Sequence, residues 1–181
     1  MIENILSVTR IQSDEKANMR VVKTVEAVEE VIAEAVAAVR KRSPQAVINV
    51  VPPGDLLLVP MDVILIMQVL VNLLENALRH AGRKDVHITI GAEKTDDGYA
   101  RVTVRDDGRG VQEEILPHLF EIHPKENIRG EDASRGLGMG LSICKTIVKA
   151  HGGTIQGGNQ PEGGAVFVMQ LPLQQEDTHG E

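Results

Sequence analysis

Apolar residues recur along the chain with two periods, and the period distinguishes helices from strands. In the segments 24–42 and 62–81 they recur at steps of three and four, which predicts two amphipathic helices. Asp62 is placed to cap the second helix, and Gly82 to end it. A further helix is predicted over 138–151.

Short apolar runs between turn residues predict strands. The runs are 47–51, 56–59, 86–92, 99–105, 154–157 and 165–171. The turn from Thr95 to Gly98 predicts a hairpin between two of them. Helices gathered with hairpin-connected strands predict an α+β fold, a two-layer α/β sandwich in which helices cover one face of a mixed sheet.

Length and pattern predict one compact domain with two appendages. The chain has 181 residues, 42% of them apolar, which is enough for a single core. Residues 1–17 are interpreted as the stump of a preceding helix with a linker, 18–173 as the domain, and 174–181 as a loose polar tail.

Composition narrows the function classes. A net charge of −7 argues against a nucleic-acid surface. Cys144 is the single cysteine, so a disulfide framework is excluded, a reducing compartment is expected, and a plain buried thiol is predicted. The sequence shows neither an unbroken apolar run of membrane-spanning length nor a signal region, which favours a soluble, cytoplasmic chain.

Three polar or glycine-rich segments stand out by their order. They are NLLENALRH at 72–80, DDGRG at 106–110 and GLGMGL at 136–141. In that order they supply oxygen ligands for magnesium, an acceptor for a purine amine, and backbone N–H groups for phosphates. Each alone has an ordinary structural explanation, as solvated asparagines or a common turn. The glycine segment also fits neither a dinucleotide-binding loop nor a Walker A loop.

Together these segments resemble the ATP-binding domain of bacterial sensor histidine kinases, in the superfamily that also holds DNA gyrase B, Hsp90 and MutL. The resemblance covers 57–172 strongly and 1–56 weakly. It implies a Bergerat-type ATP-binding fold with a flexible ATP lid, and ATP and Mg²⁺ as ligands. Two phrases, 10–13 and 160–165, look most like the KdpD-type sensor kinases that respond to potassium and turgor.

The resemblance assigns roles to the asparagine segment. Asn76 would ligate Mg²⁺ through its amide oxygen, with Asn72 and Glu75 supporting catalysis, and Arg79 and His80 would lie near the phosphates. His80 departs from the tyrosine common in the family. Glu75 has a plain alternative as a surface charge, because adjacent positions on a helix point about 100° apart.

For the second segment, the resemblance makes Asp106 the acceptor of the adenine exocyclic amine, which explains a preference for ATP over GTP. Gly108 and Gly110 would let the backbone pass close to the base. Asp107 and Arg109 are expected to face solvent.

The polar stretch between Gly110 and Gly136 is interpreted as the mobile lid. Phe120 would anchor its hinge, and a second phenylalanine is expected about where His123 stands. Lys125 would reach the γ-phosphate, with ordinary loop charge as the alternative. The residues proposed to wrap the phosphates are Gly136, Leu137, Gly138, Met139, Gly140 and Leu141.

The histidines bear on whether the chain carries its own phosphate acceptor. His151, after the last predicted helix, is interpreted as a structural cap. None of the six histidines begins a phospho-acceptor motif on a preceding helix. The chain is therefore expected to be a fragment, inactive alone, that delivers the γ-phosphoryl group to a histidine on a separate dimerisation domain.

The expected partners are ATP, that dimerisation domain and a response regulator, with no nucleic acid. The resemblance implies a full-length membrane-associated homodimer of which this chain is a cytoplasmic part. The alternatives are an anti-sigma-type serine kinase and a nucleotide-binding regulatory module without transfer activity.

Overall fold

The computed structural model describes residues 20–82, 85–121 and 140–174. In chain order the elements are β1 (Thr24–Ala27), α2 (Val28–Arg42), β2 (Val47–Val51), β3 (Leu58–Met61), α3 (Val63–His80), β4 (His87–Lys94), β5 (Tyr99–Asp106), η1 (Leu116–His118), α4 (Gly140–Ala150), β6 (Thr154–Asn159) and β7 (Ala165–Pro172).

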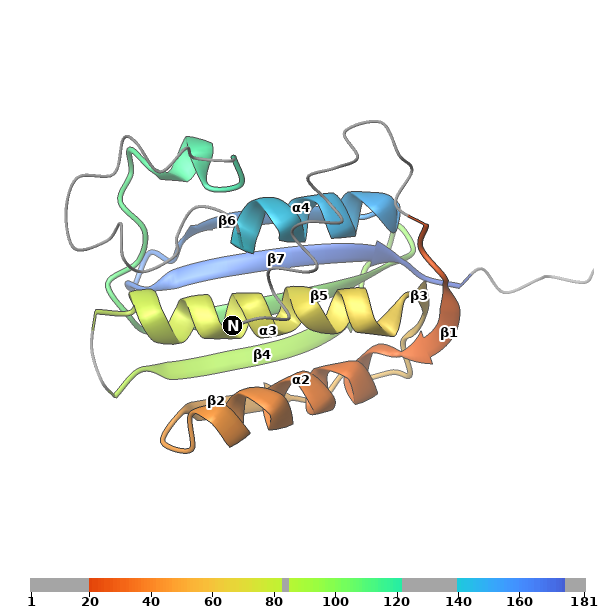
Figure 1. The fold of residues 1–181 in the computed structure, drawn as a ribbon, viewed down its shortest axis with the longest axis horizontal. Helices are drawn as coiled ribbons and strands as arrows, with labels where there is room; N and C mark the ends of the chain where they lie inside the picture. Colours follow the sequence, from red (N-terminus) through yellow and green to blue (C-terminus); the bar gives the residue numbers. More distant parts are fainter. Residues whose placement is uncertain (1–19, 83–84, 122–139, 175–181) are drawn as a thin grey trace, which may run out of the picture.

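Helices cover one face of a five-stranded sheet. The strand order is β2-β4-β5-β7-β6, with β2 parallel to β4 and the other neighbours antiparallel. Figure 1 shows α2, α3 and α4 side by side across the sheet, with α3 in the middle. The predicted α+β sandwich with a mixed sheet is confirmed, including the β4–β5 hairpin.

The core lies between the two layers, and alternation along the strands produces it. On β5, Ala100, Val102 and Val104 are buried and their neighbours are not. By length and mean hydropathy (1.3) α3 could cross a membrane. Its packing against α2, α4 and the sheet accounts for that apolar character.

The ends of α3 and α4 are tied together by a buried histidine. Asp62 caps α3 as predicted, its side chain accepting from the N–H of Leu65 at 3.3 Å. The backbone N–H of Asp62 donates to Nε2 of His151 at 3.0 Å, and Nδ1 of the same ring lies 2.7 Å from the carbonyl of Ile147. Nδ1 therefore carries the proton, and burial lowers the pKa of His151. The structural role predicted for His151 is confirmed.

One helix was predicted to begin earlier in the sequence than it does in the structure. Thr24–Ala27 forms β1, which pairs antiparallel with β3, so the helix starts at Val28 rather than Thr24. The β-branched Thr24 and Val25 suit this pairing, and the helical spacing continued through them only by coincidence. The strand expected at 56–59 is also displaced, to Leu58–Met61, because its register is fixed by β1.

Several predictions fall outside the described residues. They are the stump at 1–17, the tail beyond Gln174, and the lid, of which 122–139 is not described. The helix expected over 138–151 is seen as α4 from Gly140.

Candidate functional site

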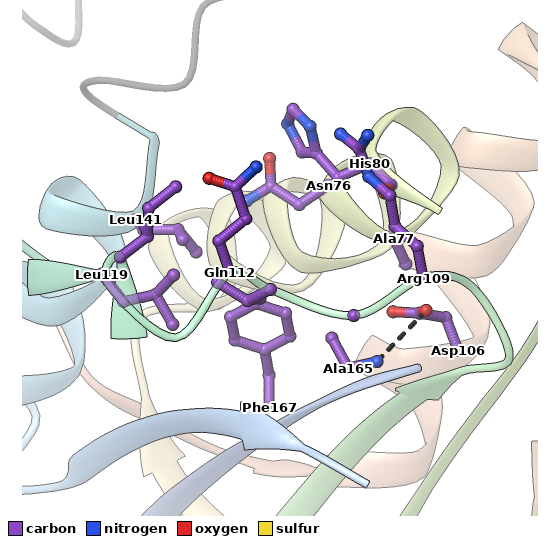
Figure 2. A pocket seen from close by; sticks show the side chains of 13 residues that line it. Asn76, Ala77, His80, Asp106, Arg109, Gln112, Leu119, Leu141, Ala165 and Phe167 are labelled. Atoms are coloured by element: carbon purple, nitrogen blue, oxygen red, sulfur yellow. Dashed lines mark hydrogen bonds between the residues drawn. The ribbon is translucent and has the colours of Figure 1, made fainter. Parts of the chain in front are cut away.

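A pocket opens between α3, the segment after β5, the start of α4 and β7 (Figure 2). The space within it is about 690 Å³ when the open solvent at its mouth is included. Its polar lining residues come from α3, from the last residue of β5 and from the segment after it: Asn76, His80, Asp106, Arg109 and Gln112.

The rest of the lining is mainly apolar. It includes Ala77 on α3, Leu119 just after η1, Leu141 on α4, and Ala165 and Phe167 on β7. A mostly apolar pocket with a few placed polar groups is the usual form of a small-molecule site. The pocket can therefore hold an aromatic base against apolar walls while its polar groups fix orientation.

Asp106 is the buried polar group of this pocket, with 6% of its surface exposed. Its Oδ1 accepts the backbone N–H of Gly108 at 2.9 Å and that of Ala165 at 3.3 Å. Among the described residues, Oδ2 accepts no hydrogen bond. The carboxylate is thus held in one orientation with an acceptor oxygen left for a ligand that donates.

The turn after Asp106 packs tightly on the end of α3. A Cβ on Gly108 would lie 2.5 Å from the Cα of Ala81, and the N–H of Arg109 donates to the Ala81 carbonyl at 2.9 Å. Glycine at 108 is therefore required by packing on α3. Its predicted contact with the base, and that of Gly110, which lines the pocket, stay predictions.

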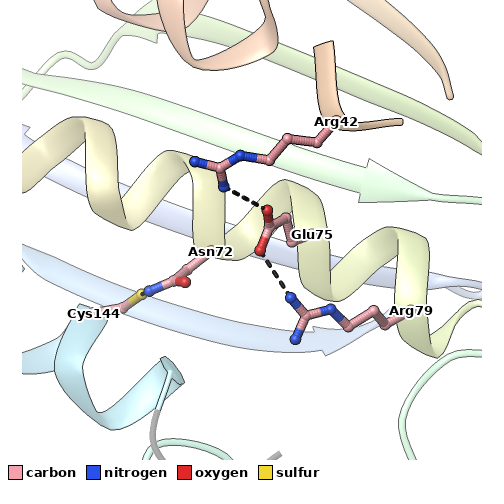
Figure 3. Close-up of polar contacts among 5 residues, drawn as sticks. All are labelled: Arg42, Asn72, Glu75, Arg79 and Cys144. Atoms are coloured by element: carbon pink, nitrogen blue, oxygen red, sulfur yellow. Dashed lines mark hydrogen bonds and ion pairs between the residues drawn. The ribbon is translucent and has the colours of Figure 1, made fainter. Parts of the chain in front are cut away.

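Of the asparagine segment, Asn76 and His80 line the pocket (Figure 2). Within the described part of the chain, the Asn76 amide forms no hydrogen bond and is available to a ligand. Asn72 does not line the pocket; its Nδ2 lies 3.7 Å from Sγ of Cys144 (Figure 3). Burial raises the pKa of the Cys144 thiol to about 12, so the predicted plain buried thiol is confirmed.

Glu75 and Arg79 lie outside the pocket lining. Glu75 pairs with Arg42 at 3.0 Å and with Arg79 at 2.9 Å, and the two arginine side chains are 62% and 52% exposed (Figure 3). These ion pairs fit the alternative in which Glu75 is an ordinary surface charge. A catalytic role for Glu75 and a phosphate contact for Arg79 stay predictions.

The glycine segment is described only from its last two residues. Gly140 begins α4, and a Cβ there would lie 3.9 Å from Cγ of Asn72, so the segment ends beside α3. Leu141 lines the pocket, and Phe120 is half-buried against the core. The other predicted ligands lie outside the described residues: Lys125, Gly136, Leu137, Gly138 and Met139.

Sequence reasoning missed part of the pocket. Arg109 is exposed as expected, yet it lines the pocket, and its Nε donates to the His80 carbonyl at 3.2 Å. Gln112, Ile115 and Phe167 were not predicted to line it. The apolar run 165–171 predicted the strand that carries Phe167, but not which cavity this side chain faces.

Fold and pocket now define the class of protein. The family described as "Histidine kinase-, DNA gyrase B-, and HSP90-like ATPase" matches residues 61–175, and the chain belongs to this family. The matched region contains α3, the Asp106 turn and α4, and thus the pocket described here.

Within that family the chain is similar to KdpD. It is 39% identical over 173 residues to the sensor protein KdpD of Clostridium acetobutylicum, and 36% identical over 176 residues to that of Escherichia coli strain K12. These matches cover 95% and 96% of the chain but 19% of each relative. The predicted resemblance to sensor histidine kinases, and to KdpD within them, is confirmed.

Solved structures agree. The catalytic domain of histidine kinase ThkA superposes with a TM-score of 0.69 at 29% identity, over 83% of this chain and 95% of that one. ThkA in complex with the response regulator TrrA gives 0.72 at 27% identity, over 96% and 47%. The fold is therefore that of a histidine-kinase ATP-binding domain.

Proposed function

We propose that this chain binds Mg-ATP in the pocket beside α3 and delivers the γ-phosphoryl group to a histidine on a separate dimerisation domain. The observation that carries the proposal is the Asp106 carboxylate, which is buried in the lining of a mainly apolar pocket and fixed through Oδ1. An acceptor held in that way selects a purine that donates there, which adenine does and guanine does not.

Different residues of the pocket would contact different parts of the nucleotide. Phe167 and Leu119 offer apolar surface to a base, while Asp106 accepts its amine. Asn76 and His80, on the opposite wall, offer polar side chains to the rest of the nucleotide. The start of α4 beside Asn72 aims backbone N–H groups at anionic oxygens.

The donor set fits magnesium held largely by phosphate oxygens. The described residues contain no group of three or more His, Cys, Asp or Glu side chains placed to hold a metal. Asn76, with its amide available in the pocket, fits the single protein ligand that Mg²⁺ commonly takes beside phosphates and waters. The ion would supply neutralisation of phosphate charge.

The rest of the proposal concerns the whole protein, of which this chain spans about a fifth of the length of its KdpD relatives. We infer that the chain is the cytoplasmic ATP-binding part of a membrane-associated, homodimeric sensor kinase with a response regulator as partner. The ThkA–TrrA complex supports a response-regulator partner, and the KdpD similarity supports a role in potassium or turgor sensing.

Radiolabelled ATP and a separately prepared dimerisation domain test the transfer. The chain alone should bind ATP with almost no turnover, and it should label the added domain when Mg²⁺ is present. Asp106→Ala should lose both activities. The label should be released by acid and retained in base, as expected for phosphohistidine.

The two alternatives give different results. An acid-stable label on a serine would favour the anti-sigma-type serine kinase. ATP binding without transfer to the added domain would favour the regulatory module. A parent chain that binds no adenine nucleotide would refute the proposal.

A further inference from the structure

The backbone that carries Asp106 is held by the loop between β6 and β7. Asn159, the last residue of β6, makes two hydrogen bonds with one residue of the pocket: the N–H of Val111 donates to Oδ1 at 2.7 Å, and Nδ2 donates to the Val111 carbonyl at 2.7 Å. This pairing fixes the amide orientation, because the acceptor must face the N–H and the donor the carbonyl.

Gln160 holds the other end of the same segment. Its Nε2 donates to the Asp106 carbonyl at 2.7 Å and to the Ala165 carbonyl at 3.3 Å. The two neighbouring side-chain amides therefore hold both ends of the segment 106–111. Gln160 binds Asp106, 54 positions away in sequence, and Asn159 binds Val111, 48 positions away. We call Asn159 and Gln160 the amide clamp.

The backbone of the loop is shaped to this contact. Gly164 has a φ of +88°, and a Cβ there would lie 1.9 Å from the Asp106 carbonyl oxygen, so only glycine fits. The next residue, Ala165, donates its N–H to Oδ1 of Asp106. The loop therefore sets both the backbone and the carboxylate of Asp106.

Neither clamp residue lines the pocket. The described hydrogen bonds of their side chains go to backbone atoms of Asp106, Val111 and Ala165, so the clamp acts on a ligand through these three residues. A hydrogen bond to a buried carboxylate depends steeply on its position. Loosening the backbone of 106–111 should thus weaken recognition of the base more than it lowers the stability of the fold.

We propose that Asn159 and Gln160 are positioning residues that orient Asp106 for recognition of the purine amine and so determine base selectivity. This inference rests on the proposed nucleotide site. Its sharpest probe is a pair of ligands: ATP, and purine riboside triphosphate, which lacks the exocyclic amine but keeps the ring and the phosphates.

The variants are Asn159→Ala, Asn159→Asp and Gln160→Met. Asn159→Asp keeps the acceptor for the Val111 N–H and places an oxygen against its carbonyl, whereas Gln160→Met keeps length and removes the donor. Glu162→Ala, on the exposed part of the same loop, is the matched control. Calorimetry gives both affinities, and urea unfolding gives stability.

The parent should prefer ATP over the amine-free analogue by about 10- to 150-fold, the scale of a hydrogen bond to a charged group. In the three clamp variants this ratio should fall to within about threefold, with the loss on the ATP side, while the control keeps the parent ratio. Backbone-amide exchange at Val111 should be faster in Asn159→Ala.

Two results would overturn the inference. One is an unchanged ratio in folded clamp variants. The other is an equal loss for both ligands, which would make the loop merely structural. A parent that binds ATP and the analogue equally would instead contradict the proposed role of Asp106. The clamp would then be judged by Val111 exchange alone, and an unchanged rate in Asn159→Ala would refute it.

Discussion

Replacing Asp106 with asparagine is the most direct test of base selection. Asparagine keeps the shape of the side chain and an acceptor for the N–H groups of Gly108 and Ala165, which lie 2.9 and 3.3 Å from Oδ1. Because the asparagine oxygen must accept these two N–H groups, its NH₂ group takes the place of Oδ2. A donor then faces the adenine amine, and the hydrogen bond is lost.

The magnitude follows from burial and charge. Asp106 is 6% exposed, so water cannot easily replace the lost contact. A hydrogen bond to a charged group contributes about 1.5–3 kcal/mol, so ATP and ADP should each bind about 10- to 150-fold more weakly. GTP should gain relative to ATP, because its carbonyl now meets a donor. Stability should fall by about 1–2 kcal/mol, since two N–H bonds change from a charged to a neutral acceptor.

Calorimetry with ATP, ADP and GTP in magnesium buffer, at a temperature where urea curves show the variant folded, gives these values. Asp107→Asn is the matched control, because Asp107 pairs with His87 at 3.0 Å and does not line the pocket. The assignment of Asp106 is refuted if folded Asp106→Asn binds ATP as the parent does. It is refuted equally if Asp107→Asn loses as much affinity.

Three further predictions concern other residues. Asn76→Ala should weaken ATP binding in magnesium and leave binding in EDTA nearly unchanged, since it removes a metal ligand and not a base contact; calorimetry with and without the metal checks this. Cys144, with its pKa raised to about 12, should resist iodoacetamide at pH 8 in the folded protein and react in urea, as mass spectrometry would show. Since burial lowers the pKa of His151 below its ordinary 6.5, the unfolded chain binds a proton there first as pH falls. The contribution of His151 to stability should therefore be present above pH 6.5 and decline below it, and urea unfolding at pH 7.5 and 5.5 measures this.

Each of these three predictions has a result that would contradict it. An equal loss of affinity in EDTA for Asn76→Ala would make that residue part of the base or sugar site. Rapid alkylation of Cys144 in the native state would contradict its burial. A parent whose stability drops between pH 7.5 and 5.5 no more than that of His151→Gln would refute the assignment of pH dependence to His151.

Local patterns predicted much of the fold. The stripe on α3 with its Asp62 cap, the β4–β5 hairpin and the apolar run that forms β7 all depend on neighbours within a few residues, and these elements were predicted. Asp106 could be placed at the end of a strand for the same reason. Periodicity and turn residues are properties of consecutive positions, so they can be recognised without knowing the tertiary packing.

Tertiary structure decided the features that depend on distant partners. Thr24–Ala27 continues a helical spacing and became a strand because β3 pairs with it. Glu75 could be a pocket residue or a surface charge, and the position of Arg42, 33 residues away, put it in a surface ion pair. Nothing in the local sequence marks Asn159 as the partner of Val111.

The sequence by itself therefore determined most of the helices and strands, the family, and the residue types available for a nucleotide. The tertiary structure alone decided which of those side chains face one cavity and which backbone supports them. The physical reason is that secondary structure depends on short-range backbone and side-chain preferences. The pocket instead depends on hydrogen bonds such as Gln160 to Asp106, which join residues 54 positions apart and form only when the sheet has set its register.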